Sequence, residues 1–142
     1  MPAITPEVRE LVQRTRLGFV ATVNADGSPN VSPKVTVRVW DDDHLIFADL
    51  ESPGTMRNLR RDPRVEVNVV DPILRKGFRF RGRARVVTTG PEHERAVGFY
   101  VMGPEERCTS PSTRGSHWQA TASATRSSSA RSWSLRSPSS PS

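Results

Sequence analysis

The sequence predicts a small, mainly β domain whose strands form an antiparallel barrel with short helices between them. Five segments are rich in β-branched and aromatic residues or alternate between apolar and polar residues, as strands do. Most of these segments are separated by a few turn residues, which favours antiparallel hairpins and a barrel. The chain has 142 residues, of which 35% are hydrophobic, and this suits one domain with a modest core.

The first expected elements are a helix and a β-hairpin. The sequence Thr-Pro-Glu at residues 5–7 is typical of a helix start, with a side-chain cap, an early proline and an acid near the positive end of the helix dipole. This helix is expected to end near Thr15. Residues 17–24 have the composition of a strand, and Ala-Asp-Gly at residues 25–27 predicts a hairpin turn.

Residues 29–31 are expected to lead into a second strand, which runs to Trp40 and carries the cations Lys34 and Arg38. An even spacing on a strand places two side chains on one face, so both cations are expected to point the same way. Three aspartates at residues 41–43 form the next turn, and residues 44–49 form the third strand.

A short helix, two strands and a last helix are expected to follow. The short helix starts at Ser52-Pro53, and Asp62-Pro63 stops it. Residues 64–70 alternate between valine and other residues, which predicts a half-buried strand. Residues 77–87 alternate in the same way and carry a row of arginines on one face. A last helix starts near Thr89. Its apolar side is expected to be formed by Ala96, Phe99, Tyr100 and Val101.

The positive charge of the chain is concentrated near its end. Residues 1–106 contain 16 Lys and Arg against 15 Asp and Glu, which leaves a net charge of about +1. Residues 107–142 contain five Arg and no acidic residue. A nearly neutral domain gives little support for a nucleic-acid footprint, so we expect no nucleic-acid partner. The basic tail leaves a salt-sensitive nucleic-acid binder as a minor alternative.

The chain divides into a folded domain at residues 1–106 and a Ser/Arg-rich tail at residues 107–142. The tail shows no strand or helix periodicity and almost no aliphatic residues, which predicts disorder. A second interpretation is a shift of reading frame between about Gly103 and Cys108, because the chain uses Arg far more than Lys, as GC-rich genes do. If this tail is what the cell makes, the barrel is expected to lack its closing strand.

Several functional classes find no support in the sequence. The single cysteine, Cys108, excludes an internal disulfide. No run of about 18 apolar residues occurs, and the first residues do not resemble a signal peptide, so a cytoplasmic protein without membrane contact is expected. The three histidines and the cysteine lack metal-ligand spacing, and no metal site is expected. No nucleophile with a paired base can be named, so the catalytic residues stay unknown.

The most informative stretch is residues 32–58, where a cationic strand precedes a helix start. The segment Ser52-Pro53-Gly54-Thr55 offers backbone N–H groups at the positive end of a helix. Lys34 and Arg38 are expected nearby. Two cations beside a helix start favour a phosphate site.

The sequence LGFVATVNADGSPNVSPKVTVRVWDDDHLIFADLESPGTMRNLRRDPRVEVNVVDP, followed by GFRFRGRARV, resembles the pyridoxamine 5′-phosphate oxidase-like family, the FMN-binding split barrels. The resemblance covers roughly residues 5–103. It implies a six-stranded antiparallel Greek-key split β-barrel with small flanking helices. It also implies a homodimer that holds two FMN molecules at the subunit interface.

The resemblance places the flavin ring along residues 33–38 and the phosphate at the start of the short helix. Gly54-Thr55 stands where the pyridoxamine phosphate oxidases have Arg-Lys, so Lys34 and Arg57 are expected to supply the charge. The Arg-x-His segment that holds pyridoxal phosphate in those oxidases has no counterpart here. The implied cofactor-binding residues are Ser32, Lys34, Val35, Thr36, Arg38, Ala48, Asp49, Thr55, Arg57 and Asn58.

The resemblance favours an FMN-dependent oxidoreductase that acts on a small substrate, and true pyridoxamine 5′-phosphate oxidase activity is not expected. Some similar barrels use a deazaflavin coenzyme, which is the alternative cofactor, and others handle haem. The alternative of another class is a non-catalytic flavin-binding or sensor protein. Absence of an obvious catalytic side chain does not separate these hypotheses, because a flavin carries its own chemistry.

Overall fold

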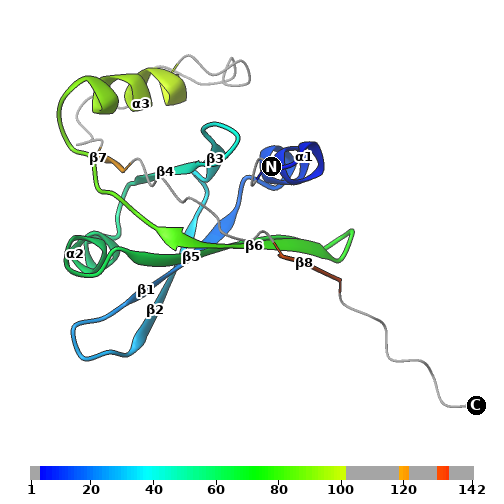
Figure 1. Cartoon of the computed structure of the whole chain (residues 1–142), viewed down its shortest axis with the longest axis horizontal. Coiled ribbons are helices and arrows are strands. Elements are labelled where there is room, and N and C mark those ends of the chain that lie inside the picture. Colours follow the sequence, from blue (N-terminus) through cyan, green and yellow to red (C-terminus); the bar gives the residue numbers. More distant parts are fainter. Residues whose placement is uncertain (1–3, 102–118, 122–130, 135–142) are drawn as a thin grey trace, which may run out of the picture.

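The computed structural model describes residues 4–101, 119–121 and 131–134, which form antiparallel sheets with three helices around them (Figure 1). A long sheet has the strand order β2-β1-β5-β6-β8, and a short sheet has the order β3-β4-β7. Every strand pair in these residues is antiparallel. The elements are α1 (Pro6–Thr15), β1 (Gly18–Val23), β2 (Pro29–Lys34), β3 (Arg38–Val39), β4 (Leu45–Asp49), α2 (Pro53–Arg61), β5 (Arg64–Asp71), β6 (Lys76–Arg83), α3 (Pro91–Val101), β7 (Gln119–Thr121) and β8 (Arg131–Ser134).

The first helix and the first hairpin form as predicted. The Thr5 hydroxyl accepts a hydrogen bond from the backbone N–H of Val8 at 3.4 Å, so Thr5 caps α1. Gly27 has a φ of 84°, which the hairpin turn requires and which glycine adopts without strain. The turn closes with a hydrogen bond of 2.9 Å from the N–H of Asn24 to the carbonyl of Ser28.

The predicted second strand is two strands, which corrects one expectation. β2 ends at Lys34, the chain turns, and β3 begins at Arg38 in the other sheet. The even spacing of these cations therefore does not place them on one face, and that prediction is wrong. Lys34 is buried, whereas the Arg38 guanidinium donates to the carbonyls of Val35 and Val37 at 3.0 and 2.9 Å. A run of β-branched residues hides this turn in the sequence.

The core explains why β4 is buried along its whole length. Leu45 and Phe47 face the main core between the sheets, which also takes up Val8 and Val12 of α1. Ile46 faces the other way, into a smaller cluster with Ala96 of α3. Figure 1 shows α3 on the side of the short sheet that faces away from the long sheet. The short sheet is thus a layer between α3 and the main core.

The second half of the domain largely follows the predicted pattern. In β5 the valines at 65, 67 and 69 are buried, as expected from their alternation. The side chain of Arg64 hydrogen-bonds to Asp62 after α2, and together with the Arg64 backbone N–H it lowers the pKa of Asp62 to about 2. β6 ends at Arg83, earlier than predicted, because the next residue bonds out of the strand: the N–H of Ala84 donates to the Pro63 carbonyl at 2.7 Å.

The last helix of the continuous segment, α3, differs from expectation in one residue. Ala96 is buried as predicted, but Phe99 is 37% exposed. Its ring lies 5.2 Å from that of Trp40, measured between centroids. Tyr100 uses its hydroxyl to donate to the carbonyl of Thr36 at 2.7 Å. α3 is therefore attached by aromatic and polar contacts as well as by apolar burial.

Two short segments of the tail are strands. β7 pairs with β4, where Ala120 lies opposite Ala48, and β8 pairs with β6, where Arg131 lies opposite Arg79. The expectation that the tail adds no strand is corrected at these residues. The physical reason is that backbone N–H and C=O groups at an open strand edge pair with any non-proline sequence, whatever its side-chain pattern. The remaining tail residues, to which the predictions of disorder and of a frame shift also apply, lie outside the described part. The domain boundary at residue 106 also stays a prediction.

Among the residues that the structure describes, no helix is both long enough and apolar enough to cross a membrane.

A close contact between β1 and residues 35–37, the crossing segment that leads from β2 to β3, gives the first testable prediction. A Cβ atom added at Gly18 would lie 2.7 Å from Cγ2 of Val37, a stiff side chain in the core. The change Gly18→Ala is expected to lower the free energy of unfolding by about 1–3 kcal/mol. Urea denaturation measures this.

The matched control is Gly54→Ala, where the nearest atom to an added Cβ is Arg57 Nη2 at 4.0 Å. This variant should be as stable as the parent chain or slightly more so, because alanine favours the helix. Equal effects of the two substitutions would contradict the packing described.

Candidate functional site

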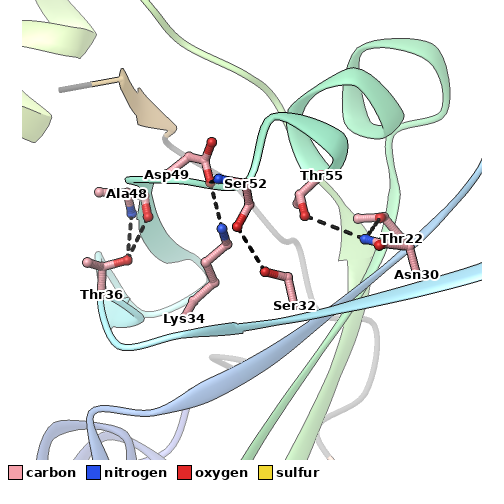
Figure 2. A network of polar contacts seen from close by, with 9 residues as sticks. All are labelled: Thr22, Asn30, Ser32, Lys34, Thr36, Ala48, Asp49, Ser52 and Thr55. Atoms are coloured by element: carbon pink, nitrogen blue, oxygen red, sulfur yellow. Dashed lines mark hydrogen bonds and ion pairs between the residues drawn. The ribbon is translucent and has the colours of Figure 1, made fainter. Parts of the chain in front are cut away.

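An ion pair between the two sheets lies at the centre of the site. Lys34 ends β2 and Asp49 ends β4, and Lys34 Nζ lies 2.6 Å from Asp49 Oδ1. Figure 2 shows the lysine side chain reaching from β2 to the carboxylate. The two side chains are only 5% and 7% exposed. This buried pair ties the long sheet to the short sheet where the chain crosses between them.

The crossing segment itself is held by Thr36. Its hydroxyl donates to the carbonyl of Ala48 at 2.7 Å and accepts from the N–H of Ala48 at 3.0 Å (Figure 2). One side chain thus satisfies two backbone groups of β4, as a neighbouring strand would. On its other side, the carbonyl of Thr36 accepts from Tyr100 of α3. The segment after β2 is therefore fixed between β4 and α3.

The start of α2 lies directly beside the ion pair. The N–H of Ser52 donates to the same Asp49 oxygen, Oδ1, at 3.2 Å. The Ser52 hydroxyl lies 3.1 Å from the Ser32 hydroxyl on β2 and does not cap the helix. The first turn of α2 consequently lacks the side-chain acceptor that an N-terminal serine normally supplies. The positive end of the helix faces a group of hydroxyls and a lysine.

A network of amides and hydroxyls docks α2 onto the first hairpin. The side-chain amide nitrogen of Asn58 donates to the Thr22 hydroxyl at 3.1 Å. It also donates to Oδ1 of Asn24 at 2.9 Å. The amide nitrogen of Asn30 donates to Thr22 at 3.1 Å and to the Thr55 hydroxyl at 3.5 Å. Because a side-chain amide has two N–H groups, Asn58 has no further donor to offer. Its contacts fix the position of α2.

Arg57 is an exposed cation beside the start of α2. Its Nη2 atom lies 4.0 Å from the position that a Cβ of Gly54 would take, so the guanidinium reaches back along the first turn. Within the described residues the Arg57 side chain makes no ion pair or hydrogen bond. Its charge is available to an anion placed at the helix start.

The structure brings most of the predicted cofactor residues together. Those that meet at the junction of β2, β4 and α2 are Ser32, Lys34, Thr36, Ala48, Asp49 and Thr55. Asn58 lies one turn further along α2, buried among amides. Val35 is 62% exposed at the turn after β2. Arg38 lies past that turn and bonds the backbone of the crossing segment, so it does not join Lys34.

Sequence reasoning missed other polar residues of the site. These are Thr22, Asn30, Ser52 as a partner of Ser32 and Asp49, and Tyr100. The alternation of β1 offered a signal, because it places Thr22 on the same buried face as Val20. No local signal connects Tyr100 with Thr36, since 64 residues separate them.

Chemically, the arrangement is suited to binding an anion. It offers a lysine, an arginine, three hydroxyls and an uncapped helix start. In the described part of the chain, no three His, Cys, Asp or Glu side chains come together as metal ligands would. These donors fit a phosphate group. Asp49 is the exception, because a carboxylate repels phosphate.

Comparison with known proteins defines first the fold and then the family. The crystal structure of HupZ from Group A Streptococcus is 30% identical and superposes with a TM-score of 0.72, covering 94% of this chain and 95% of that one. The fold is thus a mainly antiparallel split barrel, as predicted. The sequence model of pyridoxamine 5′-phosphate oxidase matches residues 4–115. This chain therefore belongs to the pyridoxamine 5′-phosphate oxidase family.

Two more distant structures share the fold. An F420 reductase superposes with a TM-score of 0.64 at 23% identity, covering 87% of this chain and 94% of its own. HutZ, a heme storage protein from Vibrio cholerae, superposes with a TM-score of 0.59 at 20% identity, covering 92% and 94%. A search of curated proteins found no match to this chain. Because the HupZ match covers 94% of the chain, it extends past residue 106 into the tail.

The buried ion pair gives the second testable prediction. Replacing one partner, as in Lys34→Met, leaves the Asp49 carboxylate buried without its counter-ion. The free energy of unfolding is expected to fall by about 3–5 kcal/mol. The double variant Lys34→Met/Asp49→Leu removes both charges and should recover most of this loss. Urea unfolding curves measure both.

The control is Lys76→Met. The Lys76 side chain is 58% exposed, and its Nζ atom lies 3.6 Å from Oε1 of Glu7. An exposed pair of this kind contributes little, so this variant should stay within about 0.5 kcal/mol of the parent. A Lys34→Met variant as stable as Lys76→Met would refute the role given to the pair.

Proposed function

We propose that this chain binds FMN at the junction of β2, β4 and α2 and uses it to oxidise or reduce a small substrate. One observation carries the proposal: phosphate-binding donors converge on the helix start in a chain of the pyridoxamine 5′-phosphate oxidase family, whose members commonly bind flavin. The reduction or oxidation of the substrate is chemistry that the flavin supplies when bound, and the protein binds and orients both partners.

The phosphate group is assigned to the start of α2. Thr55 offers a hydroxyl there, and the first turn offers N–H groups that Ser52 does not cap. Arg57 supplies the exposed positive charge in place of the two cations that the pyridoxamine phosphate oxidases carry at Gly54-Thr55. Lys34 lies behind these groups, paired with Asp49. The site therefore combines one available cation with neutral donors.

The ring of the flavin is assigned to the crossing segment. Val35 is exposed there and gives an apolar contact, while Thr36 and Arg38 hold the segment in place through backbone bonds. Ala48 lies on the adjacent strand and is bound by Thr36. Asn58 acts as a positioning residue, because its two N–H groups are engaged by Thr22 and Asn24. With a flavin bound, the charge of Arg38 beside this segment would stabilise negative charge on the cofactor.

The alternatives from the sequence are separated by two measurements. Mass spectrometry of the cofactor released from purified protein distinguishes FMN from a deazaflavin coenzyme. Oxidation of NAD(P)H or of reduced deazaflavin in the presence of an acceptor distinguishes an oxidoreductase from a flavin-binding sensor. Bound flavin without any turnover would favour the sensor.

The third testable prediction concerns the phosphate end of the site. The parent chain is expected to bind FMN more tightly than riboflavin, which lacks the phosphate. The change Arg57→Ala is expected to weaken FMN binding by about tenfold, equivalent to 1.4 kcal/mol, because a charge-assisted contact is lost. Riboflavin binding should stay unchanged. Flavin fluorescence titration measures all four affinities.

Arg60→Ala is the control, because Arg60 is an exposed arginine of the same helix in its last turn. Its removal should not change FMN binding by more than about twofold, the effect of a distant screened charge. If neither FMN nor riboflavin binds the parent chain, the proposed function is wrong. If Arg57→Ala and Arg60→Ala behave alike, the phosphate lies elsewhere.

We further propose that the chain forms a homodimer through the outer face of β1 and β2. Phe19 and Val31 are 40% and 60% exposed, and Val35 continues the apolar surface beyond β2. Phe19 lies opposite Pro33, and Ala21 lies opposite Val31, so the apolar residues are neighbours on one face of the hairpin. A contiguous apolar surface of this kind is typical of an interface, and a second copy is the partner that the family resemblance implies.

The fourth testable prediction follows from this surface. Sedimentation equilibrium is expected to give twice the chain mass for the parent and the chain mass for Val31→Glu, because the new carboxylate would be buried without a partner. Ile73→Glu is the control, since Ile73 is 89% exposed at the turn between β5 and β6, away from β1 and β2. A dimer that survives Val31→Glu, or a parent that is monomeric, would contradict this interface.

A further inference from the structure

We infer that the Asp49 carboxylate occupies the position at the start of α2 where a phosphate group would bind. The carboxylate thereby weakens the preference of this chain for phosphorylated cofactors. This inference rests on the proposed function, which it deepens. A phosphate that uses Lys34 must take the lysine over from Asp49. Asp49 is then a residue that sets specificity between cofactors, in addition to being a structural partner of Lys34.

The contacts of one oxygen atom carry the inference. Asp49 Oδ1 accepts from Lys34 Nζ at 2.6 Å and from the backbone N–H of Ser52 at 3.2 Å. A lysine ammonium and a backbone N–H at a helix start are the two kinds of donor that phosphate oxygens take at such sites. In Figure 2 the carboxylate lies between the end of β4 and the start of α2, where both donors reach it.

Because both side chains are buried, the contact of Asp49 with Lys34 strongly affects how a phosphate group can bind here. Lys34 and Asp49 are 5% and 7% exposed, so water screens their interaction poorly. The charge of Lys34 is already balanced, and a phosphate beside it would also meet the charge of Asp49. The pair as a whole contributes no net charge to a ligand. Among the described residues beside the helix start, the uncompensated charge then comes from Arg57.

If Asp49 had a purely structural role, the loss of its carboxylate would affect ligand binding differently. If the carboxylate serves only to hold β4 against β2, its loss should loosen the site and weaken every ligand. If the carboxylate occupies the phosphate-binding position, its loss should release the charge of Lys34 and strengthen the binding only of ligands that carry phosphate. The pair FMN and riboflavin separates the two roles, because they share the ring and the ribityl chain.

The test is the change Asp49→Asn, which keeps the size of the side chain and an oxygen that accepts from Ser52. Fluorescence titration of the full chain is expected to show FMN binding tightened by about tenfold or more, the effect of one released charge. Riboflavin binding is expected to stay within about twofold, the range of a neutral change. FMN binding that is unchanged, or weakened together with riboflavin, overturns the inference.

A second variant guards against instability caused by an unpaired buried lysine. The change Lys34→Gln/Asp49→Asn removes both charges and leaves a neutral, hydrogen-bonding pair in the same place. Because its net charge equals that of the parent pair, its ratio of FMN to riboflavin affinity is expected to match the parent. A double variant that keeps the gain of Asp49→Asn shows that Lys34 is not its source, and overturns the inference.

Failure of the proposed function is distinguishable from failure of this inference. If neither the parent nor the two variants bind FMN or riboflavin, the proposed function is wrong. Pyrophosphate binding then tests the anion-binding position directly. Pyrophosphate is expected to raise the melting temperature of Asp49→Asn more than that of the parent or of the double variant, because ligand binding stabilises the folded state. Equal rises in the three chains overturn the inference.

Discussion

The rest of the structure depends on the buried ion pair between Lys34 and Asp49. The chain leaves the long sheet at Lys34, turns, and enters the short sheet at Arg38, so the ion pair lies where the two sheets are joined by a short turn. The pair fixes the end of β2 to the end of β4 at a distance of 2.6 Å. Because a buried charge without a partner is costly, the pair also makes any other arrangement of these two ends unfavourable.

The candidate functional site is a consequence of this junction. Asp49 also accepts from the N–H of Ser52, so the start of α2 is positioned by the same carboxylate that holds the sheets together. Thr22 receives amide donors from both Asn30 and Asn58, which fixes α2 against the first hairpin. The helix start, two serine hydroxyls and a lysine are thereby brought into one place. The proposed phosphate site is therefore the place where the junction of the two sheets brings polar groups together.

The sequence predicts well what depends on local chemistry. The cap at Thr5, the glycine turn at Gly27 and the alternation of β5 are each determined by neighbours within a few residues, and the structure confirms them. The start of α2 is predicted for the same reason. The family resemblance added the split-barrel fold, which local patterns do not contain and which the comparison confirms. The assignment of the crossing segment to a flavin stays a prediction.

The predictions that failed concern contacts that are distant in the sequence. The turn after Lys34 lies in a run of β-branched residues, so nothing local distinguishes it from a continuous strand. The partnership of Lys34 with Asp49 spans 15 residues, and that of Tyr100 with Thr36 spans 64. The strands at residues 119–121 and 131–134 pair through backbone groups, which a pattern of side chains does not reveal.

A crystal structure of the chain with FMN tests the central claim most directly, which is that the phosphate binds at the start of α2 beside the Lys34–Asp49 pair. We predict that phosphate oxygens lie within hydrogen-bond distance of Thr55 and of the first-turn N–H groups, with the Arg57 guanidinium turned toward them. We also predict a longer separation of Lys34 Nζ from Asp49 Oδ1 than the present 2.6 Å. A phosphate bound away from α2, with the ion pair unchanged, would contradict it.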